Sequence, residues 1–164
     1  MARSRRDAGP RTRARRSARR PLDVAIEHAT LVRAPAERTF DALATAEGLD
    51  AWFTSGTRLD PRPGGAFTWR WKDWGPDRVM TTSRGRVVAI DRPRRFVFLW
   101  ESGNETPTRV EISFTLKKDG TVVRLRETGY SDTPRGRRAF RDCSVGWGEA
   151  LTLAKMYVEH GIRY

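Results

Sequence analysis

The sequence predicts an α+β fold in which an antiparallel sheet of six strands curls around one long C-terminal helix. Apolar and polar residues alternate over most of residues 66–130, whereas helical spacing is confined to residues 36–53 and 136–160. Helices and strands are therefore segregated along the chain, which is typical of α+β proteins. The last helix would be about 36 Å long, so it can lie across the concave face of a curled sheet.

The first elements are a strand and two short helices. Residues 23–33 alternate, with His28 on the same face as its apolar neighbours, and this pattern predicts a strand. Pro35 suits the first turn of a helix, so we expect one helix over residues 36–45. A second helix over residues 46–53 would end in an apolar cluster.

Five further strands follow a loop that is rich in proline and glycine. We predict a bulge or bend at Gly85, a turn over residues 73–77 that contains Trp74, and a tight hairpin at Asp119-Gly120. The five predicted strands are residues 66–72, 79–91, 94–102, 108–118 and 121–130.

The last predicted helix, residues 136–160, carries its apolar residues at steps of three and four, with Gly161 as a stop signal. Gly146 and Gly148 flank Trp147 on this helix. Each glycine costs about 1 kcal/mol relative to alanine inside a helix. Their lack of side chains would either allow a close approach to the sheet or leave a gap, and the sequence alone does not choose between the two.

The N-terminal residues differ in composition from the rest of the chain. Residues 1–20 hold nine arginines and one aspartate, which supply most of the net charge of +12. With almost no apolar side chains, this segment should be a disordered tail, and residues 21–164 should form one domain. The tail is a solvated extension, a weak salt-sensitive contact to nucleic acid or anionic lipid, or a targeting segment. No apolar segment follows its paired arginines, which argues against a secretory signal.

Composition also bounds the class of protein. No apolar run is long enough to cross a membrane, and a single cysteine, Cys143, cannot form an internal disulfide. We therefore expect a soluble, cytoplasmic protein. The candidate metal ligands His28, His160 and Cys143 are scattered without ligand spacing, so we expect no metal and no cofactor.

Large aromatic residues recur in phase on the predicted strands, and each ring buries about 150–250 Å². Their burial is worth about 4–6 kcal/mol per ring as an upper estimate, so the rings should turn toward the C-terminal helix. They either fill a core or line a cavity beneath that helix, with Trp74 at its rim. The in-phase residues are Phe67, Trp69, Trp71, Phe96, Phe98 and Trp100.

Two residues are candidates for acid–base chemistry. His28 is interpreted first as a hydrogen-bonded core or edge residue; if it faced a cavity it could act as a general base, because its ordinary pKa lies near 6.5. Glu127 is in phase with apolar neighbours, so it should point inward and pair with an arginine, of which Arg70 is one option, or have a raised pKa. Cys143 lies on the apolar helix face and is interpreted as a small core residue. These patterns favour a binding protein over an enzyme.

Several short motifs, in order and spacing from about residue 23 to 163, resemble one branch of a known superfamily. The chain is similar to activator-of-Hsp90-ATPase-like proteins of the START-type, helix-grip superfamily, also called SRPBCC. The motifs are Ala34-Pro35-Ala36-Glu37 with Phe40, Trp52-Phe53, Pro63-Gly64-Gly65, Gly85-Arg86-Val87, Pro93-Arg94-Arg95-Phe96 with Trp100, Glu127-Thr128-Gly129-Tyr130, and Gly146-Trp147 with Leu151.

The resemblance implies a seven-stranded sheet, with one more short strand near Thr57–Asp60, that grips the C-terminal helix over a hydrophobic cavity. Related members bind lipids, hormones or polyketides, some cyclise or hydrolyse their ligands, and eukaryotic relatives stimulate the ATPase of the heat-shock chaperone. This chain departs from the pattern in its arginine-rich tail and its glycine pair, and it lacks the additional domain expected of a true co-chaperone. Because one fold hosts many activities, the resemblance does not determine the function.

Our leading hypothesis is a small apolar or aromatic ligand held between the sheet and the C-terminal helix. Its walls would be Trp69, Trp71, Phe98, Trp100, Phe114 and Trp147, with Trp52 and Phe53 near the mouth. The alternatives are a chaperone-accessory or protein-interaction module that uses the surface and basic tail, and an enzyme of the cyclase or hydrolase kind that uses His28 or Glu127. Association with nucleic acid through the arginines is a weaker option.

Overall fold

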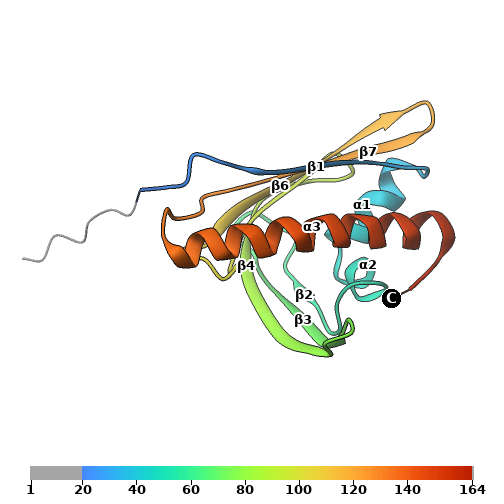
Figure 1. Ribbon diagram of the computed structural model, residues 1–164. Helices are drawn as coiled ribbons and strands as arrows, with labels where there is room; N and C mark the ends of the chain where they lie inside the picture. The colour runs from blue at the N-terminus through green and yellow to red at the C-terminus, as the bar shows by residue number, and fades with distance from the viewer. Residues whose placement is uncertain (1–19, 164) are drawn as a thin grey trace, which may run out of the picture.

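The computed structural model describes residues 20–163 and confirms the α+β prediction. Seven strands pair antiparallel in one sheet of order β1-β7-β6-β5-β4-β3-β2, and the long helix α3 lies across one face of it (Figure 1). The elements are β1 (Ile26–Val32), α1 (Ala36–Ala44), α2 (Ala46–Asp50), β2 (Arg58–Leu59), β3 (Ala66–Trp74), β4 (Val79–Asp91), β5 (Arg95–Trp100), β6 (Thr108–Lys117), β7 (Gly120–Thr128) and α3 (Pro134–His160).

The alternating pattern of the sequence places every second side chain of the central strands in the core. Ile112 of β6 lies opposite Leu125 of β7, and both are almost fully buried. The short seventh strand implied by the family resemblance is confirmed as β2, in which Arg58 pairs with Thr68 of β3. The helix α1 packs over the same face, where the ring of Phe40 lies 5.0 Å from that of Phe114.

Local sequence signals set both ends of α3. The hydroxyl of Thr133 accepts a hydrogen bond from the Gly136 N–H at 3.0 Å, and Pro134 occupies the first turn. The helix therefore begins two residues before the predicted start. At the other end, Gly161 has a φ of 69°, and its N–H donates to the carbonyl of Tyr157. This left-handed cap confirms the predicted stop.

The helix α3 lies closest to one edge of the sheet, because its backbone approaches β1 rather than β3 and β4. Nε2 of His28 lies 3.1 Å from the carbonyl oxygen of Ser144 on α3. A Cβ at Gly148 would lie 3.5 Å from the His28 ring, whereas a Cβ at Gly146 would have no neighbour within 4 Å. A side chain at Gly148 would thus make an ordinary van der Waals contact with His28, whereas Gly146 faces open space, which is the gap that the sequence left open as one alternative.

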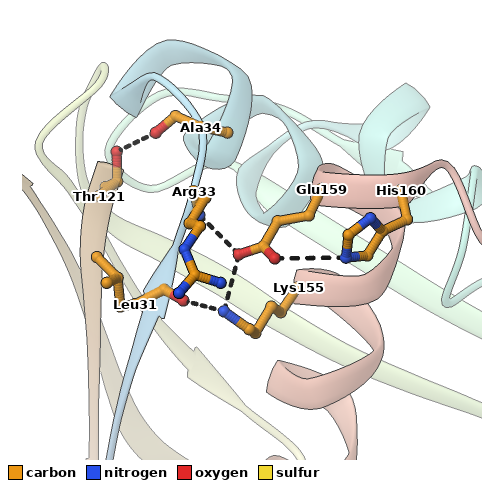
Figure 2. Close-up of polar contacts among 7 residues, drawn as sticks. All are labelled: Leu31, Arg33, Ala34, Thr121, Lys155, Glu159 and His160. Atoms are coloured by element: carbon orange, nitrogen blue, oxygen red, sulfur yellow. Dashed lines mark hydrogen bonds and ion pairs between the residues drawn. The ribbon is translucent and has the colours of Figure 1, made fainter. Parts of the chain in front are cut away.

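A charged cluster holds the C-terminal turns of α3 to the end of β1 (Figure 2). The Lys155 ammonium donates to the carbonyl of Leu31 and to Oε1 of Glu159, the latter at 2.8 Å. The same Glu159 oxygen accepts the backbone N–H of Arg33 at 2.7 Å. Only 6% of the Glu159 side chain is exposed, and its contacts fix the helix against this edge.

Two local predictions in the sheet need correction. The bulge expected as one alternative at Gly85 is not there, because the register of β4 shifts later, between Val87 and Ala89. A Cβ at Gly85 would lie 2.2 Å from the Phe67 ring, so glycine is needed there for close packing. Trp74 is not in a turn either; it is the last residue of β3, after a register shift.

The predicted tail comprises residues 1–20, and all of it except Arg20 lies outside the described part of the chain. From Arg20 onward the backbone is tied to the segment that follows β7. The carbonyl of Arg20 accepts the N–H of Asp132 at 2.8 Å, and the Leu22 N–H donates to the carbonyl of Tyr130 at 2.8 Å. Within residues 20–163, no helix combines the length and apolar character needed to span a membrane.

Candidate functional site

An aromatic groove of about 730 Å³ lies between α3 and the strands β3, β4 and β5. It occupies the side of the sheet from which α3 stands away, so the asymmetric position of the helix creates it. Its lining residues are Phe53, Trp71, Trp74, Val79, Thr81, Thr82, Ser83, Trp100, Glu101, Ser102, Asp142, Cys143, Gly146, Trp147, Glu149 and Ala150.

Two groups of rings form the walls of the aromatic groove. Phe53, which follows α2, packs edge-on against Trp71 and Trp74 of β3, with ring centroids 5.3 Å and 5.4 Å away. Trp100 of β5 and Trp147 of α3 form the second group, with centroids 5.5 Å apart. These edge and tilted contacts are the preferred geometries of aromatic pairs, so the rings hold one another in place around the groove.

A buried carboxylate fixes the second group of rings. Glu127 of β7 is fully buried, and its Oε1 accepts the indole N–H of Trp100 at 2.7 Å and the hydroxyl of Thr108 at 2.5 Å. Its Oε2 accepts the indole N–H of Trp147 at 2.6 Å. The sequence correctly placed Glu127 inward, but the favoured arginine partner was wrong, and Arg70 is exposed. Within residues 20–163 the hydrogen-bond partners of the Glu127 carboxylate are two indole N–H groups and one hydroxyl.

Two further polar groups lie beside Glu127. Tyr130 is fully buried, and its hydroxyl has no hydrogen bond of normal geometry within residues 20–163. Burial, together with the negative charge of Glu127, raises the pKa of Tyr130 far above its ordinary value. Burial also raises the pKa of the Cys143 thiol to about 11. Cys143 is therefore a half-buried protonated thiol, which agrees with its interpretation as a core residue.

Four of the predicted wall and mouth residues line the aromatic groove, namely Phe53, Trp71, Trp100 and Trp147. The other four pack in the core beneath it, namely Trp52, Trp69, Phe98 and Phe114. The Trp52 indole donates to the carbonyl of Ala42 at 2.9 Å, so this ring ties the segment after α2 to α1. Phe98 is fully buried and contacts Trp69 at a centroid distance of 5.3 Å, which makes it a second layer behind the groove.

The two acid–base candidates, His28 and Glu127, make hydrogen-bonding contacts with other groups of the protein. His28 is half-buried against α3, where its Nε2 faces the Ser144 carbonyl, and both oxygens of Glu127 accept hydrogen bonds. Neither residue is among those that line the aromatic groove. Sequence reasoning missed Thr108 as a partner of Glu127. The signal that finds it is strand register, since Thr108 pairs with Trp100 and lies two residues before Val110, the partner of Glu127.

Two other hollows on the described surface are more polar. One of about 430 Å³ lies between the end of α2 and the end of β3, and Lys72 and Arg163 are among its walls. The other, of about 960 Å³, lies between α1, α2 and the end of α3, and Arg38, Asp41 and Glu47 help to line it. No cluster of three or more His, Cys, Asp or Glu within residues 20–163 could hold a metal ion.

Comparison with known proteins gives one family and a set of similar folds. The family model described as Activator of Hsp90 ATPase homolog 1-like protein matches residues 33–159. No curated protein sequence matches the chain.

Three of the similar solved structures illustrate the likeness. Protein SSP2350 from Staphylococcus saprophyticus is 20% identical, with a TM-score of 0.69 over 86% of this chain and 96% of that one. The Aha1 dimer from Colwellia psychrerythraea is 20% identical, with a TM-score of 0.69 over 84% of this chain and 98% of that one. CalU16 from Micromonospora echinospora is 21% identical, with a TM-score of 0.64 over 84% of this chain and 77% of that one. At these identities the likeness shows the shared fold, a sheet that grips a C-terminal helix.

Proposed function

This chain belongs to the family of Activator of Hsp90 ATPase homolog 1-like proteins, and from that premise we propose that it binds one small apolar molecule in the aromatic groove. The groove volume of about 730 Å³ falls in the range of small-molecule sites, about 300–1,000 Å³. Four tryptophans and one phenylalanine line it, and a ligand that covers their exposed parts would remove apolar surface from water.

The observation that carries this proposal is the shared anchor of Trp100 and Trp147. Indole N–H groups usually find a partner when buried, and here one carboxylate serves both, from two different elements. The rings are thereby held at fixed angles before any ligand arrives. A preorganised wall lowers the entropic cost of binding. The geometry therefore supports recognition of a flat or compact apolar body.

The same anchor favours binding over catalysis. Glu127 and His28 are the acid–base candidates; both make hydrogen bonds inside the protein, and neither lines the groove. A general base must come within hydrogen-bonding reach of the proton that it abstracts. A ligand in the aromatic groove would instead meet the faces and edges of the rings.

A titration with the neutral dye 1-N-phenylnaphthylamine tests the proposal. We expect a single saturable site, with dye fluorescence rising as tryptophan emission falls. Gly146→Leu should weaken binding at least about tenfold, because the new side chain enters the groove and a Cβ there meets no protein atom within 4 Å. Val145→Leu, at an exposed position beside it, is the matched control and should bind like the wild type. Non-saturable binding, or equal binding by both variants, would overturn the proposal.

A further inference from the structure

The charge of the aromatic groove is opposite to that of the chain. Lysine and arginine make up 32 of the 164 residues, yet none of the sixteen lining residues is basic. Three carboxylates lie among them: Glu101 directly after β5, and Asp142 and Glu149 on α3. The two helix residues are seven positions apart, so they stand about 10 Å from each other on the same face of α3. The groove therefore has an acidic rim.

The rim carboxylates make no ion pair with a described residue, unlike several other surface acids. Asp41, for example, pairs with Arg92, and Glu111 pairs with Arg95. No salt bridge within residues 20–163 involves Glu101, Asp142 or Glu149, and all three residues are exposed. Their negative charges therefore lie at the mouth of the groove without a direct ion-pair partner among the described residues, where a charged ligand would meet them.

The aromatic walls add a second attraction for positive charge. The face of an indole carries the negative end of its quadrupole, and tryptophan is the best aromatic partner for a cation. Behind Trp100 and Trp147 lies the Glu127 carboxylate, hydrogen-bonded to both ring nitrogens. These bonds hold both rings in place, and both rings line the groove.

The shape of the acidic rim selects the kind of cation. Within residues 20–163 no three carboxylates, thiols or imidazoles converge closely enough to hold a metal ion. A hard metal cation needs a close shell of oxygen ligands, which these separated carboxylates do not form. An organic cation with a diffuse charge on an apolar body needs no such shell, so it suits separated carboxylates and aromatic walls. We propose that the aromatic groove binds an organic cation, a quaternary ammonium or protonated tertiary amine attached to an aromatic or aliphatic body. This inference rests on the proposed function and specifies its ligand class.

Three naphthalenes of matched size test the inference on the full chain. They are 2-naphthyltrimethylammonium, its neutral isostere 2-tert-butylnaphthalene, and naphthalene-2-sulfonate, each titrated by tryptophan quenching at low salt. We expect the cation to bind about tenfold more tightly than the neutral compound and the anion most weakly, with the preference reduced by added salt. Equal or weaker binding of the cation, with the neutral compound bound, would overturn this inference and leave the proposed function standing. Absence of saturable binding by all three would overturn both.

Variants that remove a negative charge test whether the rim carboxylates cause the preference for the cation. The double variant Glu101→Gln, Glu149→Gln should bring the affinities for the cation and for its neutral isostere within about threefold of each other. Asp23→Asn removes a charge at an exposed position that does not line the groove and should leave the preference intact. An unchanged preference in the double variant, or an equal loss in Asp23→Asn, would show that overall charge rather than the acidic rim acts, and would overturn the inference.

Discussion

The indole nitrogen of Trp147 on α3 lies 2.6 Å from Oε2 of Glu127 on β7. This bond joins α3 to β7, the strand next to the β1 edge of the sheet, where Glu127 is fully buried. An indole N–H can only donate a hydrogen bond, so the position requires an acceptor. Because Trp100 donates to the other oxygen, one side chain satisfies donors from two elements.

Glu127→Gln should lower the free energy of unfolding by about 2–4 kcal/mol. The amide oxygen can serve one indole, but the NH₂ group then faces a second donor, and each buried donor left unpaired costs about 1–3 kcal/mol. Urea unfolding followed by circular dichroism measures the loss. Glu149→Gln, the same change at an exposed position, should stay within about 0.5 kcal/mol of the wild type. A Glu127→Gln protein as stable as this control would contradict the anchor role.

Two glycines on α3 should respond in opposite directions to alanine. Gly146→Ala should stabilise the fold by roughly 0.5–1 kcal/mol, because a Cβ there meets nothing within 4 Å and alanine favours the helix. Gly136→Ala should destabilise it, since the Cβ would lie 2.1 Å from the carbonyl oxygen of Ser131. Thermal melts of the two variants measure the difference. A lower melting temperature for Gly146→Ala would show that the open space beside it is not available.

Much of the fold follows from periodicity, which reports local structure. The 2.0 and 3.6 patterns predicted β4 at its observed bounds and α3 to within two residues. Gly85 shows the limit of this reasoning. A glycine within a strand is typical of either a bulge or a close approach, and the choice depends on the Phe67 ring of a neighbouring strand, which is a long-range contact.

The candidate site was predictable in kind but not in arrangement. Phase showed that Glu127 points inward together with the large rings, but its partners depend on register and on where α3 crosses the sheet. Trp69 and Trp100 both point toward the core side, yet only Trp100 lines the groove. Trp69 is covered by the rings of Phe53 and Phe98, and such long-range contacts are not reported by the periodicity of a single sequence.

The cluster of Figure 2 should make stability depend on pH at the acid side. The hydrogen bond from Lys155, and then the Arg33 N–H, lower the pKa of Glu159. A carboxyl whose pKa is depressed on folding adds stability that is complete above its unfolded pKa, about 4.3, and is lost as pH falls through the lower folded value. Glu159→Gln should therefore be less stable than the wild type at pH 7 and approach it below pH 4. Urea midpoints across this range measure the gap; a gap that stays constant with pH would contradict the assignment.

The Cys143 thiol should react slowly while the protein is folded. Burial raises its pKa to about 11, so at pH 8 the thiolate fraction falls by roughly two orders of magnitude relative to a free cysteine of pKa about 8.5. The thiol also lines the aromatic groove, so a bound ligand should slow the reaction further. Absorbance with Ellman's reagent measures the rate, and unfolding in urea should restore that of a free thiol. Gly146→Leu should lose the protection given by 1-N-phenylnaphthylamine, whereas Val145→Leu should keep it. Folded protein that reacts as fast as unfolded protein would contradict the buried, protonated state of this group.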